Sequence, residues 1–325
     1  MRVTNRIHFL IMVFTASAGC LFSQQTLAAV NNNVDVETPF RITTSTQIGI
    51  LYGDSHELVY ASSITISDLD WTLKPLTYWG TMIKLEAASG LFCSASLKAG
   101  LSGFSGTMTD SDYLNFDGVR THLSVHNCYT EDAFLFDAAL GYENRVSKAF
   151  SMGWAVFFSS MHFKWTARDG YLQYPSEPSA PYTPWDASIA KTYVYGTGMA
   201  YEQNFLIPGI AFSVRYTPIP PLSIQLALNY SPLAACNDLD NHFLRSLDFV
   251  EIMRNGTYFK PSLRAEYSTK GRISLWIAGS FTLIDNLIGN TEMTDTTTGN
   301  TTIYKDSGGA SLSMLDIGIG FSARL

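Results

Sequence analysis

The chain is poor in charge, and what charge it carries is mostly negative. Only 15% of its 325 residues are charged, against roughly 25% in soluble domains, whereas 46% are apolar. Such an apolar content argues against intrinsic disorder. The formal net charge is -7, whereas nucleic-acid-binding proteins usually carry an excess of basic residues. We therefore expect a folded protein with no nucleic-acid partner.

Cysteine and histidine are also scarce. Of four cysteines, Cys93, Cys128 and Cys236 follow the N-terminal segment, and an odd number cannot form a complete disulfide framework. One pair is compatible with an oxidising compartment, and the sequence leaves open which. Six histidines are present. His242 has no second histidine at the H-x-x-x-H spacing of a zinc site, and we expect no metal.

The N-terminus has the order of a secretory signal peptide. Arg2 and Arg6 precede the apolar run "IHFLIMVFTASAG", and small residues follow at "TLAAV". Cleavage is expected near Ala28 or Ala29. The segment "SAGC" ending at Cys20 is an alternative lipoprotein box, given less weight. The apolar run is shorter than the roughly 20 residues of a membrane-spanning helix.

No later segment has 18 consecutive apolar residues; period-two alternation dominates instead. It is clearest in residues 151–163, 221–231, 272–284 and 315–325. Such segments build either a soluble sandwich or a membrane barrel, whose outward face is apolar and whose lumen is polar or small. The aromatic residues on the apolar face, the terminal alternating strand and the signal peptide favour the barrel, and closure removes sheet edges.

Short and long connections alternate along the chain. Short turns are expected at 89–90, 143–147, 217–221 and 268–271, and longer polar connections near 61–64, 104–123, 169–191, 233–256 and 287–311. The sequence therefore predicts an all-β fold, a ten-stranded antiparallel transmembrane β-barrel with long extracellular loops and short periplasmic turns. The expected organisation is a signal peptide (1–29), a short N-terminal segment (30–39) and a single barrel (40–325).

Two acidic motifs lie at the expected loops. "MTDSDYL" contains Asp110 and Asp112, and "NDLDNHF" contains Asp238, Asp240 and His242. Alternate residues of an extended chain share one face, so each motif presents its side chains together. Carboxylates beside an imidazole can activate water and protonate a leaving amine. Acids are also ordinary loop residues, and an EF-hand calcium site lacks its glycine and distal glutamate here.

At these residues the chain resembles the omptin family of outer-membrane endopeptidases. The resemblance extends from about Phe40 to Leu325 and rests on ordered motifs: "SDLDW", "GTMTDSDYL", "FKWTARDG", "YEQNFLIPGI" and "NDLDNHF". It implies a barrel in the cell outer membrane with its active site facing the extracellular side. Leu325 stands where the family usually ends in phenylalanine.

The resemblance implies a role for each acidic residue. Asp110 and Asp112 match the family's aspartate pair, and Asp240 and His242 match its aspartate–histidine pair. His242 would be the general base for a water molecule, Asp240 would orient it, and the aspartate pair would position the water and polarise the scissile carbonyl. No covalent intermediate is implied.

Glu57 and Asp238 match the acids of the family's specificity pocket. The resemblance thus implies substrates that are peptides or proteins cleaved next to basic residues, since carboxylates bind arginine and lysine side chains.

The lipid-binding positions depart from the family. Ser160, His162 and Asn204 stand where family members hold lipopolysaccharide with charged side chains. We expect contact with outer-membrane lipid but no cofactor. The absence of charged side chains at these positions argues against lipopolysaccharide as an activator. His122 and His126 are expected to be surface loop residues, and His56 should point away from Glu57 along an extended strand.

Two functions from different classes remain. The first is an outer-membrane endopeptidase, favoured because all four catalytic-type residues and both pocket acids are present together. The second is a catalytically inactive omptin-like barrel that acts as an adhesin or structural protein through its long loops. A ten-stranded barrel is too narrow for a wide pore.

Overall fold

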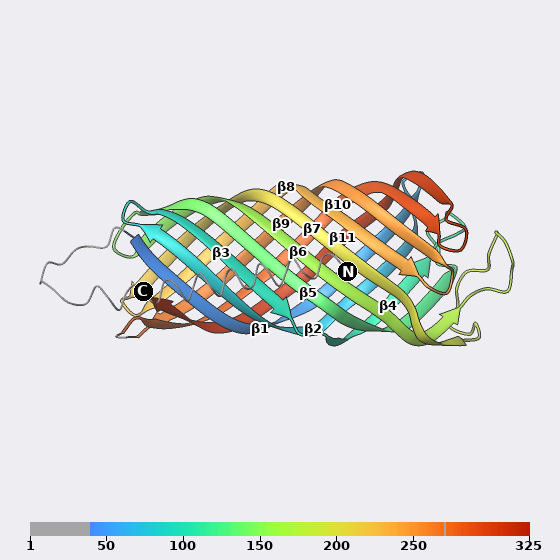
Figure 1. Cartoon of the computed structure of the whole chain (residues 1–325), viewed down its shortest axis with the longest axis horizontal. Coiled ribbons are helices and arrows are strands. Elements are labelled where there is room, and N and C mark those ends of the chain that lie inside the picture. Colours follow the sequence, from blue (N-terminus) through green and yellow to red (C-terminus); the bar gives the residue numbers. More distant parts are fainter. Residues whose placement is uncertain (1–39, 270) are drawn as a thin grey trace, which may run out of the picture. The chain divides into compact units, whose positions relative to one another are not determined.

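The computed structural model describes residues 40–269 and 271–325, and this part of the chain folds into one elongated barrel (Figure 1). The predicted signal peptide, its cleavage site and residues 30–39 lie outside the described residues. The regular secondary structure described is β-strand throughout. No helix long and apolar enough to cross a membrane occurs in the described ranges.

Eleven antiparallel strands form the wall. They are β1 (Phe40–Ala61), β2 (Ile64–Ala87), β3 (Leu91–Gly100), β4 (Gly103–Asp112), β5 (His122–Arg145), β6 (Phe150–Gln173), β7 (Thr192–Ile219), β8 (Leu222–His242), β9 (Leu247–Ser268), β10 (Ile273–Asp295) and β11 (Thr301–Arg324). Both β3 and β4 pair with β2 on one side and β5 on the other. They form one strand position that is interrupted at Leu101 and Ser102. The ring therefore has ten strand positions, the number predicted from the short turns and longer connections.

The sheet closes on itself. β1 pairs with β2 along one edge and with β11 along the other, the latter from Thr43↔Arg324 to Val59↔Gly308. Every strand therefore has two neighbours, which removes the sheet edges that lipid would not tolerate. We call the end with Phe40 and Leu325 the turn end and the opposite end the loop end (Figure 1).

The outward face carries a band of exposed apolar side chains. Examples are Trp154, Ile210, Leu226, Ile277 and Ile319, each more than half exposed. This is the composition of a lipid-facing surface.

Beyond this apolar band, toward the loop end, the outward side chains become polar. Asp54, His162, Asn204, Asn237 and Arg254 lie there and form hydrogen bonds or ion pairs along the wall. The strands thus extend past the lipid-facing zone.

The strands run further than the sequence suggested. Most of residues 233–256 and 287–311, expected as long connections, continue β8–β9 and β10–β11. Residues 289–309 have the polar, glycine- and threonine-rich composition typical of loops. A hairpin that projects into water, however, pairs its backbone groups across the two strands and does not need apolar alternation.

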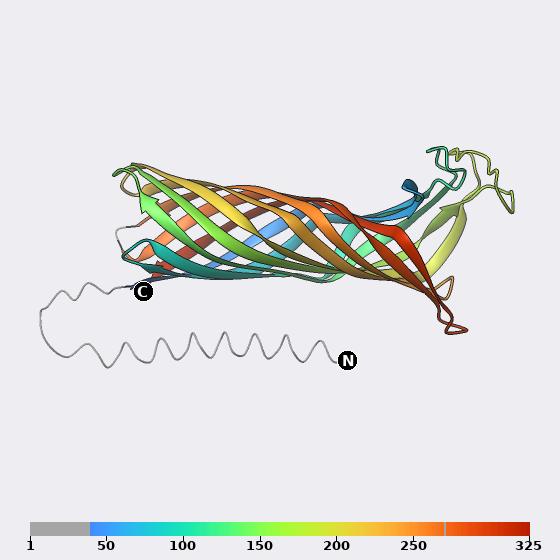
Figure 2. The ribbon, with the colours of Figure 1, turned by 90° about the horizontal axis from the view of Figure 1, so that it is seen from above.

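The longer connections are 113–121 and 174–191, and they bind each other. Asn115 exchanges two hydrogen bonds of 2.8 Å with the backbone of Tyr182, and the Arg120 guanidinium lies 4.0 Å from the Trp185 ring centroid. Figure 2 shows these two loops on one side of the loop end and the β10–β11 hairpin on the other.

An aromatic layer fills the lumen below the loop end. Trp71 of β2, Trp165 of β6 and Tyr201 of β7 are fully buried, and the Trp71 and Tyr201 ring centroids are 5.3 Å apart. Phe163 stacks on Trp165 at 5.3 Å. Close-packed interiors of this kind leave few voids larger than water, so the layer separates the loop-end mouth from the lower lumen.

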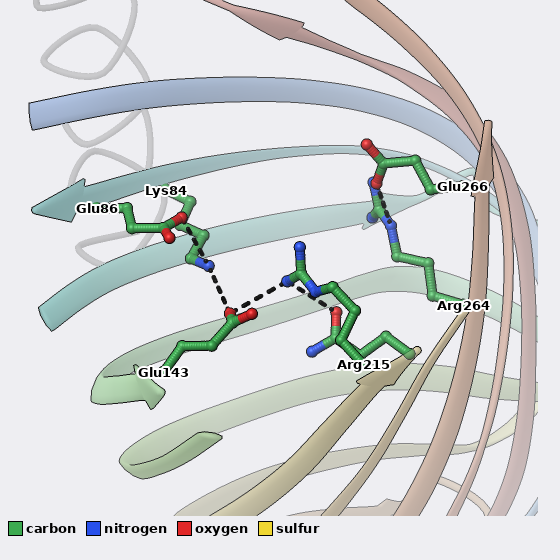
Figure 3. Close-up of polar contacts among 7 residues, drawn as sticks. Lys84, Glu86, Glu143, Arg215, Arg264 and Glu266 are labelled. Atoms are coloured by element: carbon green, nitrogen blue, oxygen red, sulfur yellow. Dashed lines mark hydrogen bonds and ion pairs between the residues drawn. The ribbon is translucent and has the colours of Figure 1, made fainter. Parts of the chain in front are cut away.

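Charged side chains occupy the lumen at the turn end (Figure 3). Glu143 of β5 bridges Lys84 of β2 at 3.4 Å and Arg215 of β7 at 3.2 Å. Arg264 and Glu266 of β9 form a separate pair at 2.9 Å. Inward-facing positions thus carry opposite charges that neutralise each other inside the barrel.

Candidate active site

A cavity of about 620 Å³ opens at the loop end above the aromatic layer. Its lining includes Glu57, Asp110, Asp112, Asp240 and His242. These five residues come from β1, β4 and β8, far apart in the sequence, and barrel closure brings them together. The cavity therefore unites both predicted catalytic pairs.

Asp240 and His242 alternate along β8, so both side chains point inward. The Asp240 Oδ2 atom contacts His242 Nε2, and Asp240 is almost fully buried. The His242 ring packs edge-on against Phe249, with 5.3 Å between centroids. The carboxylate holds the imidazole through Nε2, which leaves Nδ1 as the nitrogen that can accept a proton.

Asp110 and Asp112 occupy the end of β4, on the inward face. The Ser67 hydroxyl donates to Asp110 at 3.0 Å. Burial, followed by the nearby Asp112 carboxylate, raises the pKa of Asp110 to about 7, and the charge of His242 acts in the opposite direction. Burial also raises the pKa of Asp112. The interaction of His242 with both aspartates shows that the two pairs share one electrostatic environment.

The two predicted pocket acids lie at different depths. Leu69 of β2 pairs with both Glu57 and Asp110, which sets Glu57 beside the aspartate pair. Asp238 lies deeper, outside the cavity lining, where the Tyr201 hydroxyl donates to it at 2.9 Å. Burial is the main cause of a raised pKa in both acids, and neighbouring carboxylates add to it.

A third buried acid, Glu251 of β9, was missed by the sequence reasoning. It pairs directly with Asp238, lines the cavity and accepts a 2.6 Å hydrogen bond from Thr291. Burial raises its pKa to about 7. The polar composition of residues 233–256 predicts a loop, but Phe249, Glu251 and Met253 alternate as inward residues of β9.

Two of the remaining histidines differ from the prediction that they are surface loop residues, because both His122 and His126 belong to strand β5. His126 is buried, which corrects its prediction as a surface loop residue: it lies on the inward face of β5. His122 begins β5 and packs between Tyr174 and Tyr182. His56 points outward, away from Glu57, and bonds Asp68 at 2.8 Å.

Comparison with known proteins agrees with this architecture. The sequence profile of the Omptin family matches residues 38–325. The chain belongs to the omptin family. It is 23% identical over 279 residues to the plasminogen activator of Yersinia pestis, covering 84% of this chain and 86% of the relative. It is 24% identical over 284 residues to the outer membrane protease IcsP of Shigella flexneri, covering 85% and 87%.

The fold of this omptin matches a solved structure. The outer membrane protease OmpT of Escherichia coli superposes with a TM-score of 0.81 at 20% identity, covering 89% of this chain and 98% of OmpT. The family and the fold together make the chain an outer-membrane β-barrel protease.

The outer face of the omptin barrel holds Ser160, His162 and Asn204 at neighbouring positions. His162 Nδ1 lies 2.8 Å from the Asn204 side-chain oxygen and 3.8 Å from Glu202. Lys164, two residues further, is 3.6 Å from the same glutamate. Among the described residues, no group of three or more His, Cys, Asp or Glu side chains is arranged to hold a metal ion.

The three cysteines in the described part of the omptin chain are free thiols. Cys128 and Cys236 are buried in the wall, and Cys93 is exposed.

The acidic cavity should make the omptin barrel less stable as pH rises. Asp110 has a folded pKa of about 7 against roughly 3.9 in an unfolded chain. The stability that protonated Asp110 contributes is fully present below the pKa of the unfolded chain. It is lost as the pH rises through the pKa of the folded protein. We expect the unfolding temperature to fall by a few degrees between pH 5 and pH 8, measured by calorimetry in detergent. Asp110→Asn should flatten this slope; an equally steep slope in that variant would contradict the assignment.

Proposed function

We propose that the protein is an endopeptidase that cleaves peptide bonds next to basic residues, using water activated between Asp240/His242 and Asp110/Asp112. The observation that carries the proposal is the single cavity lined by both pairs, with Glu57 and Asp238 buried beside or beneath it. The comparison with proteases adds to it.

The chemistry follows from the atoms that face the cavity. Asp240 fixes His242 through Nε2, so Nδ1 takes a proton from water as the water oxygen attacks the scissile carbonyl. Asp110, whose raised pKa of about 7 keeps it protonated near neutrality, donates a hydrogen bond to the carbonyl oxygen as it becomes negative, and it keeps its proton when the carbonyl re-forms. Asp112 positions the water. The imidazolium then returns its proton to the leaving amine as the C–N bond breaks.

The test is cleavage of a fluorogenic peptide with an Arg-Arg or Arg-Lys bond by refolded protein, with and without lipopolysaccharide. We expect cleavage in both conditions, because Ser160, His162 and Asn204 offer no fixed cation to lipid phosphate and the chemistry needs no cofactor. Cleavage only with lipopolysaccharide would overturn that part of the proposal. No cleavage by a folded barrel would favour a catalytically inactive adhesin or structural protein.

Glu57→Gln is expected to weaken the preference for basic residues. The carboxylate forms a charge-assisted contact with the substrate cation, so its loss should lower kcat/KM for an arginine peptide roughly 10-fold or more. A peptide with a neutral residue at that position should be affected little. The matched control is Glu292→Gln, an exposed glutamate outside the cavity. Equal losses for both peptides would remove Glu57 from the specificity pocket.

The loop end is proposed to face the cell exterior. Both described ends of the barrel lie at the opposite, turn end, as the periplasmic assembly of such barrels requires. Protease accessibility of the 174–191 loop on whole cells tests this orientation.

A further inference from the structure

Three buried carboxyl groups lie beside and beneath the catalytic pairs, and none forms an ion pair among the described side chains. Glu57 of β1, Asp238 of β8 and Glu251 of β9 are each at most 5% exposed. Each has one buried oxygen without a hydrogen-bond partner: Glu57 Oε2, Asp238 Oδ1 and Glu251 Oε2. An unpaired buried carboxylate is costly, so this cluster is arranged for something that the described residues do not supply.

The cluster is compact because of strand register. Asp238 and Glu251 are direct cross-strand partners, whose Cβ atoms lie about 5 Å apart in such pairs. Glu57 is close enough for both to raise its pKa. Glu57 and Glu251 therefore face the same cavity, and Asp238 lies buried behind them as the cross-strand partner of Glu251.

A wall of small residues on β11 keeps this cavity open. Glu57 pairs with Ala310, and the Glu251 carboxyl lies over Gly308, where an added Cβ would come within 2.5 Å of its carboxyl carbon. Glycine at this position thus allows Glu251 to reach the cluster.

The nearby cations do not neutralise these acids. Arg245 and Lys305 line the same cavity, but they are exposed, and no ion pair with Glu57, Asp238 or Glu251 occurs among the described side chains. Among the described side chains these acids thus have no cationic partner, and a basic side chain of a substrate would supply one.

We propose that Glu251 is a specificity-determining residue that, with Glu57 and Asp238, makes the pocket select arginine over lysine in the substrate. The inference rests on the proposed function and adds to it a third acid and a choice between the two basic side chains. A guanidinium presents five N–H donors in a rigid plane, whereas an ammonium presents three on one atom. Glu57 and Glu251, on two strands, can accept from different parts of a guanidinium, and Asp238 behind them adds to the negative charge of the pocket.

The experiment compares two peptides that differ only in arginine or lysine at the pocket position. Binding is measured by calorimetry on His242→Ala protein, in which turnover is slow, and kcat and KM are measured on the active protein. Glu251→Gln should reduce the arginine-to-lysine affinity ratio roughly 10-fold, mostly through KM with little change in kcat. Gly308→Ala should shift the ratio in the same direction by displacing the Glu251 carboxyl.

The control is again Glu292→Gln, which should leave the ratio unchanged. An unchanged ratio in both Glu251→Gln and Gly308→Ala, in barrels that still bind the arginine peptide, would overturn this inference alone. If the His242→Ala protein binds the arginine peptide but the active protein cleaves neither, the proposed catalysis fails and the pocket assignment stands. If the unaltered pocket binds neither peptide, the pocket assignment fails.

Discussion

His242→Ala is expected to lower kcat/KM for a basic peptide by about 10²- to 10⁴-fold, the contribution of a positioned general base. The substitution removes the imidazole that lines the cavity, and with it the ring nitrogen that takes the proton from water. The measurement is steady-state cleavage of the fluorogenic peptide by refolded protein.

The folding control for His242→Ala is heat-modifiable gel migration, which reports a closed barrel. Asp240→Asn provides a second comparison: it keeps the size of the side chain but removes the charge that contacts Nε2, so activity should also fall. A His242→Ala barrel that folds and cleaves at the original rate would exclude His242 as the base.

Asp110→Ala should lower kcat about 10²- to 10³-fold, as expected when a donor to the developing oxyanion is removed. The KM should change less, because Asp110 acts on the reacting carbonyl and not on the basic side chain. Asp110→Asn retains an N–H donor at nearly the same place and should recover part of the loss. Steady-state kinetics on both variants separate these effects.

Full activity of Asp110→Ala would contradict the role given to the aspartate pair. Equal activity of the alanine and asparagine variants would contradict the donor role in particular. The matched structural control is Ser67→Ala, which removes the 3.0 Å hydrogen bond to Asp110 but leaves the carboxyl group in place. Its effect should be much smaller than that of Asp110→Ala.

The barrel was predictable because lipid imposes a strict pattern on the sequence. Wherever a strand crosses the apolar band, one face is apolar and the other small or polar, as in residues 221–231 and 272–284. Above the band water contacts the outer face and the constraint disappears. The extended portions of β8–β9 and β10–β11 therefore lack the apolar alternation, and their sequence predicts loops.

The site was predictable in part because alternate residues of a strand share one face. The i, i+2 spacing placed Asp110 with Asp112 and Asp240 with His242 on single faces, and the structure confirms that placement. Spacing along one strand cannot show that β4 and β8 face each other across a cavity; the omptin resemblance supplied that expectation. Glu251 was missed because it stands alone in its segment, and only its register opposite Asp238 shows that it belongs to the cluster.

The aromatic layer of Trp71, Trp165 and Tyr201 has a consequence for how a protein substrate is engaged. Because this layer closes the lumen, neither end of a polypeptide can pass through the barrel, and both flanks of the scissile bond must leave on the side where they entered. A substrate chain must lie across the mouth, between the 174–191 loop and the β10–β11 hairpin. Cleavage would then favour extended or protruding segments of folded proteins and be indifferent to how far away the chain termini are.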